Sequence, residues 1–316
     1  MRLKSIPARW PDTAPPLRSL LFVPGGRPDR FAKALVAGAD AVIFDLEDSV
    51  PENGKEEARR NVALGIGEAR DAAAMRVVRI NPVATRHWEK DLRAVVRPGL
   101  DAILLPKPTH AREVAAAARL ILRLERKRKI EQGTILLFLL AETAGAVLRV
   151  ESMIEASARV ALVVFGGEDY SLSTGANPAA DGRELLYARS KVVAAAAAYG
   201  CPAVDGVYMR YGDLEGLRNE AESAKRLGFS GKLIVHPAQI EPVHRVFSVS
   251  EQELEWAKSV LEVAERMAES GAGAAGLDGQ LVDTPVIARA QRIAVAAERE
   301  GRQRGKSAWT AAEKKA

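Results

Sequence analysis

Eight short apolar runs between residues 19 and 235 constrain the fold more than any other feature of the sequence. Each run is rich in Leu or β-branched residues and is apolar at successive positions. That pattern is typical of parallel strands buried on both faces. We therefore predict eight buried strands, at residues 19–23, 41–44, 76–80, 102–105, 135–140, 160–165, 203–207 and 232–235.

Longer amphipathic stretches separate these runs, and we expect them to be helices. They are residues 28–37, 55–68, 111–126, 145–156, 184–199 and 213–227, with another at 251–268. Alternation of strand and helix predicts a parallel sheet, and eight repeats match an α/β fold of the closed (β/α)8 TIM-barrel type. A doubly wound open sheet is the alternative. It would concentrate its site at one switch point, whereas polar residues here follow the second to sixth strands.

The sequence divides into four parts. Residues 1–17 are an N-terminal extension, 18–270 the catalytic barrel, 271–300 a C-terminal helical extension and 301–316 a polar tail. The extension begins with a flexible Gly/Ala linker, residues 271–276, and continues in a helix at 285–299 that has a proline in its first turn. We expect the tail to fray.

The composition indicates a cytoplasmic protein. A single cysteine, Cys201, excludes an intrachain disulfide and fits a reducing compartment. The N-terminus has no apolar signal segment, and no apolar run approaches the ~20 residues of a membrane span. The net charge of +5 leaves nucleic acid binding open, but the densest basic run, Arg123–Lys129, includes Glu125 and is typical of a solvated helix end. We expect neither a membrane nor a nucleic acid partner.

Two carboxylates are the strongest candidates for chemistry. Glu142 follows the fifth strand and Asp169 the sixth, and their separation of 27 positions corresponds to one strand–helix repeat. Adjacent strand ends bring such side chains to one rim of a barrel. Two hard oxygen ligands without Cys or His suit Mg²⁺. The alternative is that both acids merely cap helices.

Other charged residues follow neighbouring strands. Glu47 and Asp48 end the second strand region and are candidates to hold the waters of the metal or to contact the substrate. Arg79, near the end of the third strand, is a candidate for stabilising an oxyanion. Lys107 follows the fourth strand and is a candidate to contact the substrate. Arg18 precedes the first strand, and spacing alone does not say which end of the barrel it faces.

Two further features carry weaker signals. Gly25–Gly26 precedes a helix and is a candidate phosphate-binding turn. His236 follows the eighth strand and is expected to be a hydrogen-bonded wall residue rather than a base. The sequence contains no dinucleotide or Walker pattern and no serine-hydrolase elbow.

These motifs together resemble one family over about residues 18–299. The segments are Arg18-Ser-Leu-Leu-Phe-Val-Pro-Gly-Gly26, Asp45-Leu-Glu-Asp-Ser-Val50, Val78-Arg-Ile-Asn81, Leu105-Pro-Lys107, Glu142-Thr-Ala-Gly145, Phe165-Gly-Gly-Glu-Asp169, the run from Gly228 through Val-His-Pro-Ala-Gln to Ile240, and Val282-Asp283. Their order and spacing are similar to those of the citrate lyase beta-subunit and malyl-CoA lyase family, within the HpcH/HpaI aldolase superfamily.

The resemblance implies a magnesium-dependent carbon–carbon lyase that works as a homotrimer or a dimer of trimers. It implies that Glu142 and Asp169 bind Mg²⁺ and that Arg79 contacts the substrate. Arg18 takes the position of the arginine that opens the family's first motif and is a candidate to contact the substrate. Asp283 takes that of an aspartate that reaches the site of a neighbouring subunit, on which the C-terminal extension at residues 271–300 would pack. The departures are Ala141, Ala144-Gly-Ala146 and Tyr170, which put the identity of the substrate in question but not metal binding.

The resulting hypothesis is retro-aldol or Claisen-type cleavage, or formation, of a short hydroxyacyl thioester of coenzyme A, such as a malyl, citramalyl or citryl thioester. Arg79 would stabilise the enolate, and Asp283 would exchange the carbon-bound proton. Two alternatives remain at this point. One is a CoA-independent, metal-dependent pyruvate aldolase, and the other is a non-catalytic subunit that binds acyl carriers in a larger lyase complex.

Overall fold

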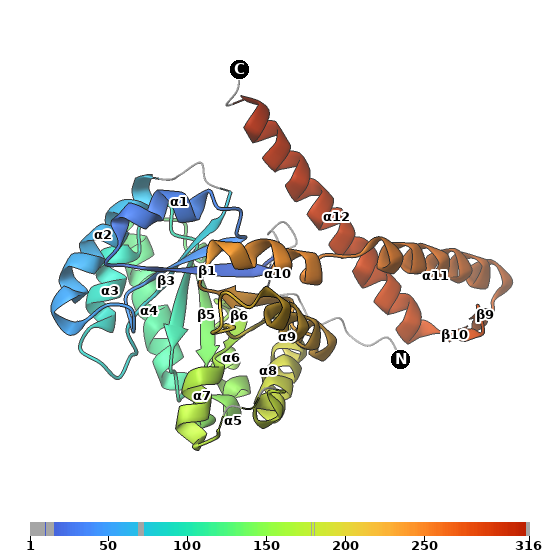
Figure 1. Ribbon diagram of the computed structural model, residues 1–316, viewed down its shortest axis with the longest axis horizontal. Coiled ribbons are helices and arrows are strands. Elements are labelled where there is room, and N and C mark those ends of the chain that lie inside the picture. The colour runs from blue at the N-terminus through green and yellow to red at the C-terminus, as the bar shows by residue number, and fades with distance from the viewer. Residues whose placement is uncertain (1–9, 11–15, 69–72, 178, 180, 314–316) are drawn as a thin grey trace. The chain divides into compact units, whose positions relative to one another are not determined.

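The eight predicted strands close into a barrel in the computed structural model. The structure describes residues 10, 16–68, 73–177, 179 and 181–313, and the side chains of residues 10, 16–67, 73–177, 179 and 181–301. Each strand pairs in parallel with the next, and the eighth pairs with the first (Figure 1). The strands are β1 (Ser19–Pro24), β2 (Ala41–Asp45), β3 (Met75–Arg79), β4 (Ala102–Pro106), β5 (Leu136–Ala141), β6 (Val160–Phe165), β7 (Ala203–Asp205) and β8 (Gly231–Ile234). The prediction of a (β/α)8 barrel is confirmed.

Both faces of the barrel wall are apolar. In β5, Phe138 and Leu140 belong to a cluster built from residues of all eight strands, whereas Leu137 and Leu139 belong to a second cluster that includes the surrounding helices. Trp10 joins the inner cluster, with its ring 6.1 Å from that of Phe138. Because side chains fill the interior of the barrel, a ligand site has to lie at one of its ends.

Helices follow the strands around the barrel wall. They are α1 (Phe31–Leu35), α2 (Lys55–Glu68), α3 (Trp88–Val95), α4 (Ala111–Arg128), α5 (Ala144–Leu148), α6 (Val150–Glu155), α7 (Gly167–Thr174), α8 (Leu186–Ala198), α9 (Leu214–Leu227) and α10 (Ile240–Phe247), with short 3₁₀ turns η1 (Pro28–Arg30), η2 (Glu52–Gly54), η3 (Arg183–Leu185) and η4 (Pro237–Gln239).

The sequence analysis missed some of these helices. It did not predict α3, α7 and α10, and each of them has only eight residues. Such lengths are too short for a helical period to stand out. The single helix predicted at 145–156 is two helices, because Arg149 takes a non-helical conformation (φ −120°, ψ 17°) between α5 and α6.

The remainder of the chain, residues 248–316, is a separate compact unit. It contains α11 (Glu251–Ser270), a two-stranded antiparallel hairpin of β9 (Ala275–Leu277) and β10 (Gln280–Val282), and α12 (Thr284–Glu313). Ser250 begins α11 with a capping box in which its side chain and that of Glu253 each accept the other's backbone N–H. Val260, Val263 and Val282 form part of a small apolar core of this unit.

The structure adds detail to two expectations for this unit. The Gly/Ala segment at 271–276, predicted to be a flexible linker, runs into strand β9. The backbone of the tail after residue 300 continues α12 to Glu313, and flexibility of the linker and fraying of the tail stay predictions. The contacts divide the chain after Phe247 rather than near residue 270, while the proposed roles of the four sequence segments stay predictions. No helix in the part of the chain that the structure describes is long and apolar enough to cross a membrane.

Candidate active site

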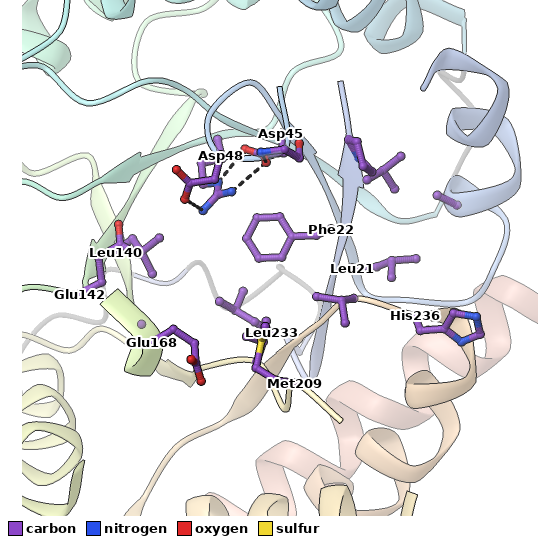
Figure 2. A pocket seen from close by; sticks show the side chains of 18 of the residues that line it. Leu21, Phe22, Asp45, Asp48, Leu140, Glu142, Glu168, Met209, Leu233 and His236 are labelled. Carbon is purple, nitrogen blue, oxygen red and sulfur yellow. Dashed lines mark hydrogen bonds and ion pairs between the residues drawn. The ribbon is translucent and has the colours of Figure 1, made fainter. Parts of the chain in front are cut away.

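A cavity of about 860 Å³ opens at the carboxyl end of the barrel strands. Its lining comes from residues at or just beyond the ends of β1, β2, β3, β5, β6, β7 and β8. Figure 2 shows Phe22 in the middle of the view, with Glu142 and Leu140 on one side and Leu21 and His236 on the other. This end of a parallel barrel is where its strands deliver polar side chains to a common space.

Glu142 and Asp169 both line this cavity. Glu142 is 3% exposed, and its Oε1 accepts a hydrogen bond from the backbone N–H of Lys107 at 3.0 Å. The side chain of Glu142 lies directly against Gly166, where a Cβ atom would stand 2.5 Å from the Cβ of Glu142. Only glycine permits this close approach between the β6–α7 turn and the acid.

Neither acid caps a helix. The N-cap of α5 is Thr143, whose hydroxyl accepts the N–H of Ala146, and α7 begins after Gly166 without a side-chain cap. Asp169 lies in the first turn of α7, and its Oδ1 is 3.5 Å from Lys107 Nζ. The capping alternative is therefore wrong for both residues, and Lys107 contacts both of them.

Arg79 is held by an acidic cluster from the end of β2. Its Nε and Nη2 donate to the two oxygens of Asp45 at 2.6 and 2.7 Å, and Nη1 lies 3.1 Å from Glu47 and 3.5 Å from Asp48. The guanidinium also stands 4.8 Å over the ring of Phe22. Burial alone would lower the pKa of Arg79, but Asp45 and the other acids raise it, so this arginine stays charged.

The acids of the cluster are not equally stable as anions. Burial raises the pKa of Glu142 well above its usual value, and the negative charges of Glu47 and Asp169 raise it further. Burial also raises the pKa of Glu47, to about 7, because the nearby Arg79 and Lys107 offset it only in part. In contrast, hydrogen bonds from Arg79 outweigh the burial of Asp45 and lower its pKa.

A divalent cation fits this arrangement. Both carboxylate oxygens of Glu47 are buried without a partner in hydrogen-bond geometry, although Lys107 Nζ and Arg79 Nη1 lie within 3.0 and 3.1 Å. Buried acids in this state are costly unless positive charge is supplied. Among the described residues no three His, Cys, Asp or Glu side chains are grouped to hold a metal by themselves. Glu142 and Asp169 would thus be the protein ligands, as suits Mg²⁺, which keeps several waters.

The position of Lys107 differs from that of the substrate-contacting residue that the sequence suggested. It is absent from the cavity lining, and its Nζ lies 3.0 Å from Glu47 and 3.5 Å from Asp48. Its backbone is left-handed (φ 51°), which is unusual for a residue other than glycine. That conformation aims the N–H of Lys107 at Glu142 while its side chain contacts the other acids.

Arg18 lies away from the cavity. It precedes β1, and its side chain donates two hydrogen bonds to Asp40, at 2.8 and 3.0 Å. Asp40 directly precedes β2, so this pair is at the amino end of the barrel, opposite Glu142. The placement corrects the expectation that Arg18 contacts the substrate.

Asp283 belongs to the second unit, where its Oδ1 accepts the N–H of Val286 at the start of α12. Its role at a neighbouring subunit stays a prediction. His236 lines the cavity, accepts the N–H of Ala238 and stacks on Tyr211, as expected of a wall residue. The N–H of Gly25 donates to the carbonyl of Asp45 at 2.8 Å, so this amide is used within the protein rather than offered to a phosphate.

The sequence analysis missed several lining residues. Asp45 stands inside a motif that it quoted, and its position as the last residue of β2 could have identified it. Arg30 and Lys33 lie in the turn and helix after β1, and Met209 in the loop after β7. Arg30 and Lys33 fall in the helix predicted at residues 28–37, but nothing distinguished them from other charged residues of a helix. Met209 lies in a loop, where no periodic pattern identifies a residue.

Comparisons with known proteins point to one group. Residues 18–237 match the HpcH/HpaI aldolase/citrate lyase family, and residues 202–283 match the C–C bond lyases of the TIM-barrel fold. The citrate lyase subunit beta of Escherichia coli K12 is 36% identical over 90% of this chain and 94% of its own length. The mitochondrial citramalyl-CoA lyase of Rattus norvegicus is 31% identical over 88% and 85%.

A solved structure agrees with these relatives. The protein CitE of Mycobacterium tuberculosis, in complex with magnesium, acetoacetate and coenzyme A, has a TM-score of 0.72 and 32% identity to this chain. The match covers 91% of this chain and 100% of that one. The similarity therefore extends beyond the barrel into the second unit.

Proposed function

Because the chain belongs to the HpcH/HpaI aldolase/citrate lyase family, we propose that it is a Mg²⁺-dependent carbon–carbon lyase acting on a short hydroxyacyl thioester of coenzyme A. The observation that carries the proposal is the pairing of Glu142 with Asp169 at adjacent strand ends. Both acids line one cavity, and Lys107 contacts both. Magnesium in the solved relative supports the same cation here.

Glu142 and Asp169 would hold the cation, and Glu47 and Asp48 would face its water ligands. When bound, Mg²⁺ supplies Lewis acidity to the hydroxyl and carboxylate oxygens of the short acid. The protein contributes a fixed cluster of oxygen atoms, held in place by Lys107 and by the close packing of Gly166 against Glu142.

Cleavage needs one proton removed and one returned. The hydroxyl group loses its proton and becomes the carbonyl of a keto acid. The electron pair of the broken carbon–carbon bond moves to the thioester as an enolate, whose carbon then takes a proton to give an acyl-CoA. Arg79 has five N–H groups and donates two of them to Asp45. It therefore keeps N–H groups that can stabilise the enolate oxygen.

The cations on the side of the cavity opposite Glu142 suit coenzyme A, the carrier of the acyl group. Arg30 and Lys33 line the cavity after β1, which pairs with β2 and β8 and thus stands across the barrel from β5. Both side chains are exposed. Coenzyme A carries phosphate groups, and exposed cations at this rim would attract them.

The proposal extends to assembly and location. We expect a cytoplasmic homotrimer or hexamer in which Asp283 of one copy exchanges the carbon-bound proton at the site of another. The position of Asp283 in a compact unit separate from the barrel is compatible with that role.

One experiment tests the activity directly. Purified protein with Mg²⁺ should convert malyl-CoA or citramalyl-CoA into acetyl-CoA plus glyoxylate or pyruvate, identified by mass spectrometry. Chelation of the metal and the variant Asp169→Asn should each abolish the reaction. Release of free CoA with the hydroxyacid intact would indicate a hydrolase instead. Turnover only of free pyruvate with an aldehyde would indicate the aldolase, and turnover only after partner proteins are added would indicate the non-catalytic subunit.

A further inference from the structure

The loop after β2 carries part of the acidic cluster, and its backbone is held from two sides. This acid loop, residues 46–49, contains Glu47 and Asp48, and Asp48 lines the cavity (Figure 2). On one side, the carboxylate of Asp45 accepts the N–H of Glu47 at 2.9 Å and that of Ser49 at 3.1 Å. The same carboxylate accepts two hydrogen bonds from Arg79. Asp45 thereby fixes the N–H groups of the acid loop relative to the guanidinium of Arg79.

On the other side, Lys55 holds the carbonyl groups of the acid loop. It is the first residue of α2, and its Nζ donates to the carbonyl oxygen of Leu46 at 2.8 Å and to that of Glu47 at 2.7 Å. The carboxylate of Glu47 lies 3.0 Å from Lys107 Nζ and 3.1 Å from Arg79 Nη1. Lys55 thus fixes the backbone of the residue whose carboxylate reaches both of these cations.

The position of Lys55 is unfavourable for a lysine by itself. A cation in the first turn of a helix opposes the helix dipole. The residue is also only 9% exposed, although lysine is rarely buried without a partner. Its hydrogen bonds go to the acid loop rather than to Glu56 and Glu57, the exposed residues that follow it. The contact with the acid loop is therefore what stabilises this buried ammonium group.

A second support of the acid loop comes from the end of β3. The carbonyl oxygen of Leu46 also accepts a hydrogen bond from Asn81 Nδ2 at 3.0 Å, and the same amide group donates to the fully buried carboxylate of Asp91 at 2.7 Å. The N–H of Leu46 donates to the carbonyl oxygen of Arg79 at 2.9 Å. The acid loop is thus joined directly to the backbone of Arg79, and a shift of the loop would displace both Glu47 and the guanidinium.

We propose that Lys55 is a positioning residue of the site, which keeps the carboxylate of Glu47 and the guanidinium of Arg79 in the geometry that the reaction requires. Lys55 lies outside the cavity lining, so it acts through the acid loop and does not contact the substrate. Residues that hold metal-facing groups from behind commonly have such a role. The inference rests on the proposed function and extends it to a residue behind the cavity wall.

The first test replaces the ammonium group. Lys55→Met keeps a similar length but removes the N–H donors and the charge. It should lower kcat by about 10–100-fold and raise the dissociation constant of Mg²⁺ about tenfold, while KM for the thioester changes less than about twofold. Loss of a nearby positive charge would by itself strengthen Mg²⁺ binding, so weaker binding is specific to lost positioning. Lys55→Arg, which keeps the charge and the N–H donors, should recover part of both losses.

Further variants separate positioning from a general loss of structure. Lys191→Met removes the ion pair between Lys191 and Glu151, outside the cavity lining, and should leave kcat and Mg²⁺ binding unchanged. In the double variant Lys55→Met/Glu47→Gln, the loss of kcat should be at least about fivefold smaller than the product of the two single losses, because both changes disturb the same carboxylate. Urea unfolding of every variant gives the folded fraction, to which each kcat is referred.

Two results would overturn the inference. One is wild-type kcat with tighter Mg²⁺ binding in Lys55→Met, which would show that the ammonium group contributes only charge. The other is a loss in the double variant equal to the product of the single losses. If Lys55→Met does not fold, Lys55→Gln, which has a shorter and uncharged side chain, gives the same comparison. If the wild type cleaves no thioester, the lyase function fails, and the Mg²⁺ affinities of the same variants still decide whether Lys55 positions the acid loop.

Discussion

The two ends of the barrel each hold an arginine against an aspartate that flanks β2. At the amino end, Arg18 binds Asp40 just before the strand begins. At the carboxyl end, Arg79 binds Asp45, the last residue of the strand. The bond lengths are similar, from 2.6 to 3.0 Å, and both aspartates are buried. The two pairs differ in what surrounds them.

At the amino end the charges are matched. His244 also contacts Asp40, at 3.4 Å. Burial alone would raise the pKa of Asp40, but hydrogen bonds from His244 and Arg18 lower it to about 2. At the carboxyl end Glu47, Asp48, Glu142 and Asp169 exceed the nearby cations, and burial raises the pKa of Glu47 and of Glu142. A cluster in which opposite charges are matched stabilises the fold by itself. A cluster with an excess of buried acids is destabilising until a bound cation compensates their charge.

The largest expected effect is at the carboxyl end. Asp169→Asn should lower kcat/KM by at least about 10³-fold, because loss of a metal ligand removes several kcal/mol of Lewis-acid stabilisation. Mg²⁺ binding measured by calorimetry should fall in parallel, while the unfolding midpoint should change little since Asp169 lies at the cavity surface. Unchanged Mg²⁺ affinity in this variant would show that the cation is held elsewhere.

The matched change at the amino end should have the opposite signature. Asp40→Asn removes the anion that Arg18 binds at 2.8 and 3.0 Å and should cost about 3–5 kcal/mol of stability, as for other broken buried pairs. The activity of the folded molecules should be kept. Urea unfolding gives the first quantity and kcat/KM the second. Because the pKa of Asp40 is lowered to about 2, its contribution is present above the usual carboxyl pKa and is lost only as the pH falls through about 2. The difference between variant and wild type should therefore be constant from about pH 5 to 8.

A third prediction concerns the pH dependence of the acid cluster. Burial raises the pKa of Glu47 from its usual 4.5 to about 7, so the folded state holds a proton in this interval that the unfolded state releases. Folding stability contributed by this residue is therefore lost as the pH rises from 4.5 to about 7. Without added metal, Glu47→Gln should be more stable than the wild type by up to about 3 kcal/mol near pH 8 and equal to it near pH 4.

Denaturant unfolding at both pH values, with and without Mg²⁺, checks this. Mg²⁺ should stabilise the wild type near pH 8 more than it stabilises Glu47→Gln, because the variant lacks one of the negative charges that the cation compensates. A destabilised Glu47→Gln near pH 8 would mean that Glu47 is well paired, like Asp40, and would remove the contrast between the two ends.

The sequence predicted the barrel because its eight strands are apolar at nearly every position, a pattern with few alternatives. It also predicted that Glu142 and Asp169 meet at one rim, because strand ends fix that geometry. It could not place Arg18, since a residue just before a strand gives no sign of the end it faces until Asp40 is found beside it. The sequence also could not show that Lys107 contacts the acids, because nothing in the composition indicates a left-handed backbone at a lysine.

The smallest expected effect compares two lysines with left-handed backbones. Lys107 (φ 51°) lies at the carboxyl end among the acids, and Lys129 (φ 55°) ends α4 as its C-cap. Glycine adopts this conformation without strain, so Lys129→Gly should stabilise the protein by about 0.4–1 kcal/mol. Lys107→Gly relieves the same strain and keeps the N–H that Glu142 accepts, but it removes an ammonium group 3.0 Å from Glu47 and 3.5 Å from Asp169.

For Lys107→Gly we therefore expect almost no net change in stability and a Mg²⁺ affinity lower by about 10–100-fold, since residues that orient metal ligands have effects of this size. Lys107→Ala keeps the strain and should be about 1 kcal/mol less stable than Lys107→Gly, which isolates the backbone contribution at this position. Unfolding curves and calorimetric titration of Mg²⁺ measure the two quantities. Lys107→Gly could instead gain as much stability as Lys129→Gly and bind Mg²⁺ with the wild-type affinity. That result would show that Lys107 has no role in the site.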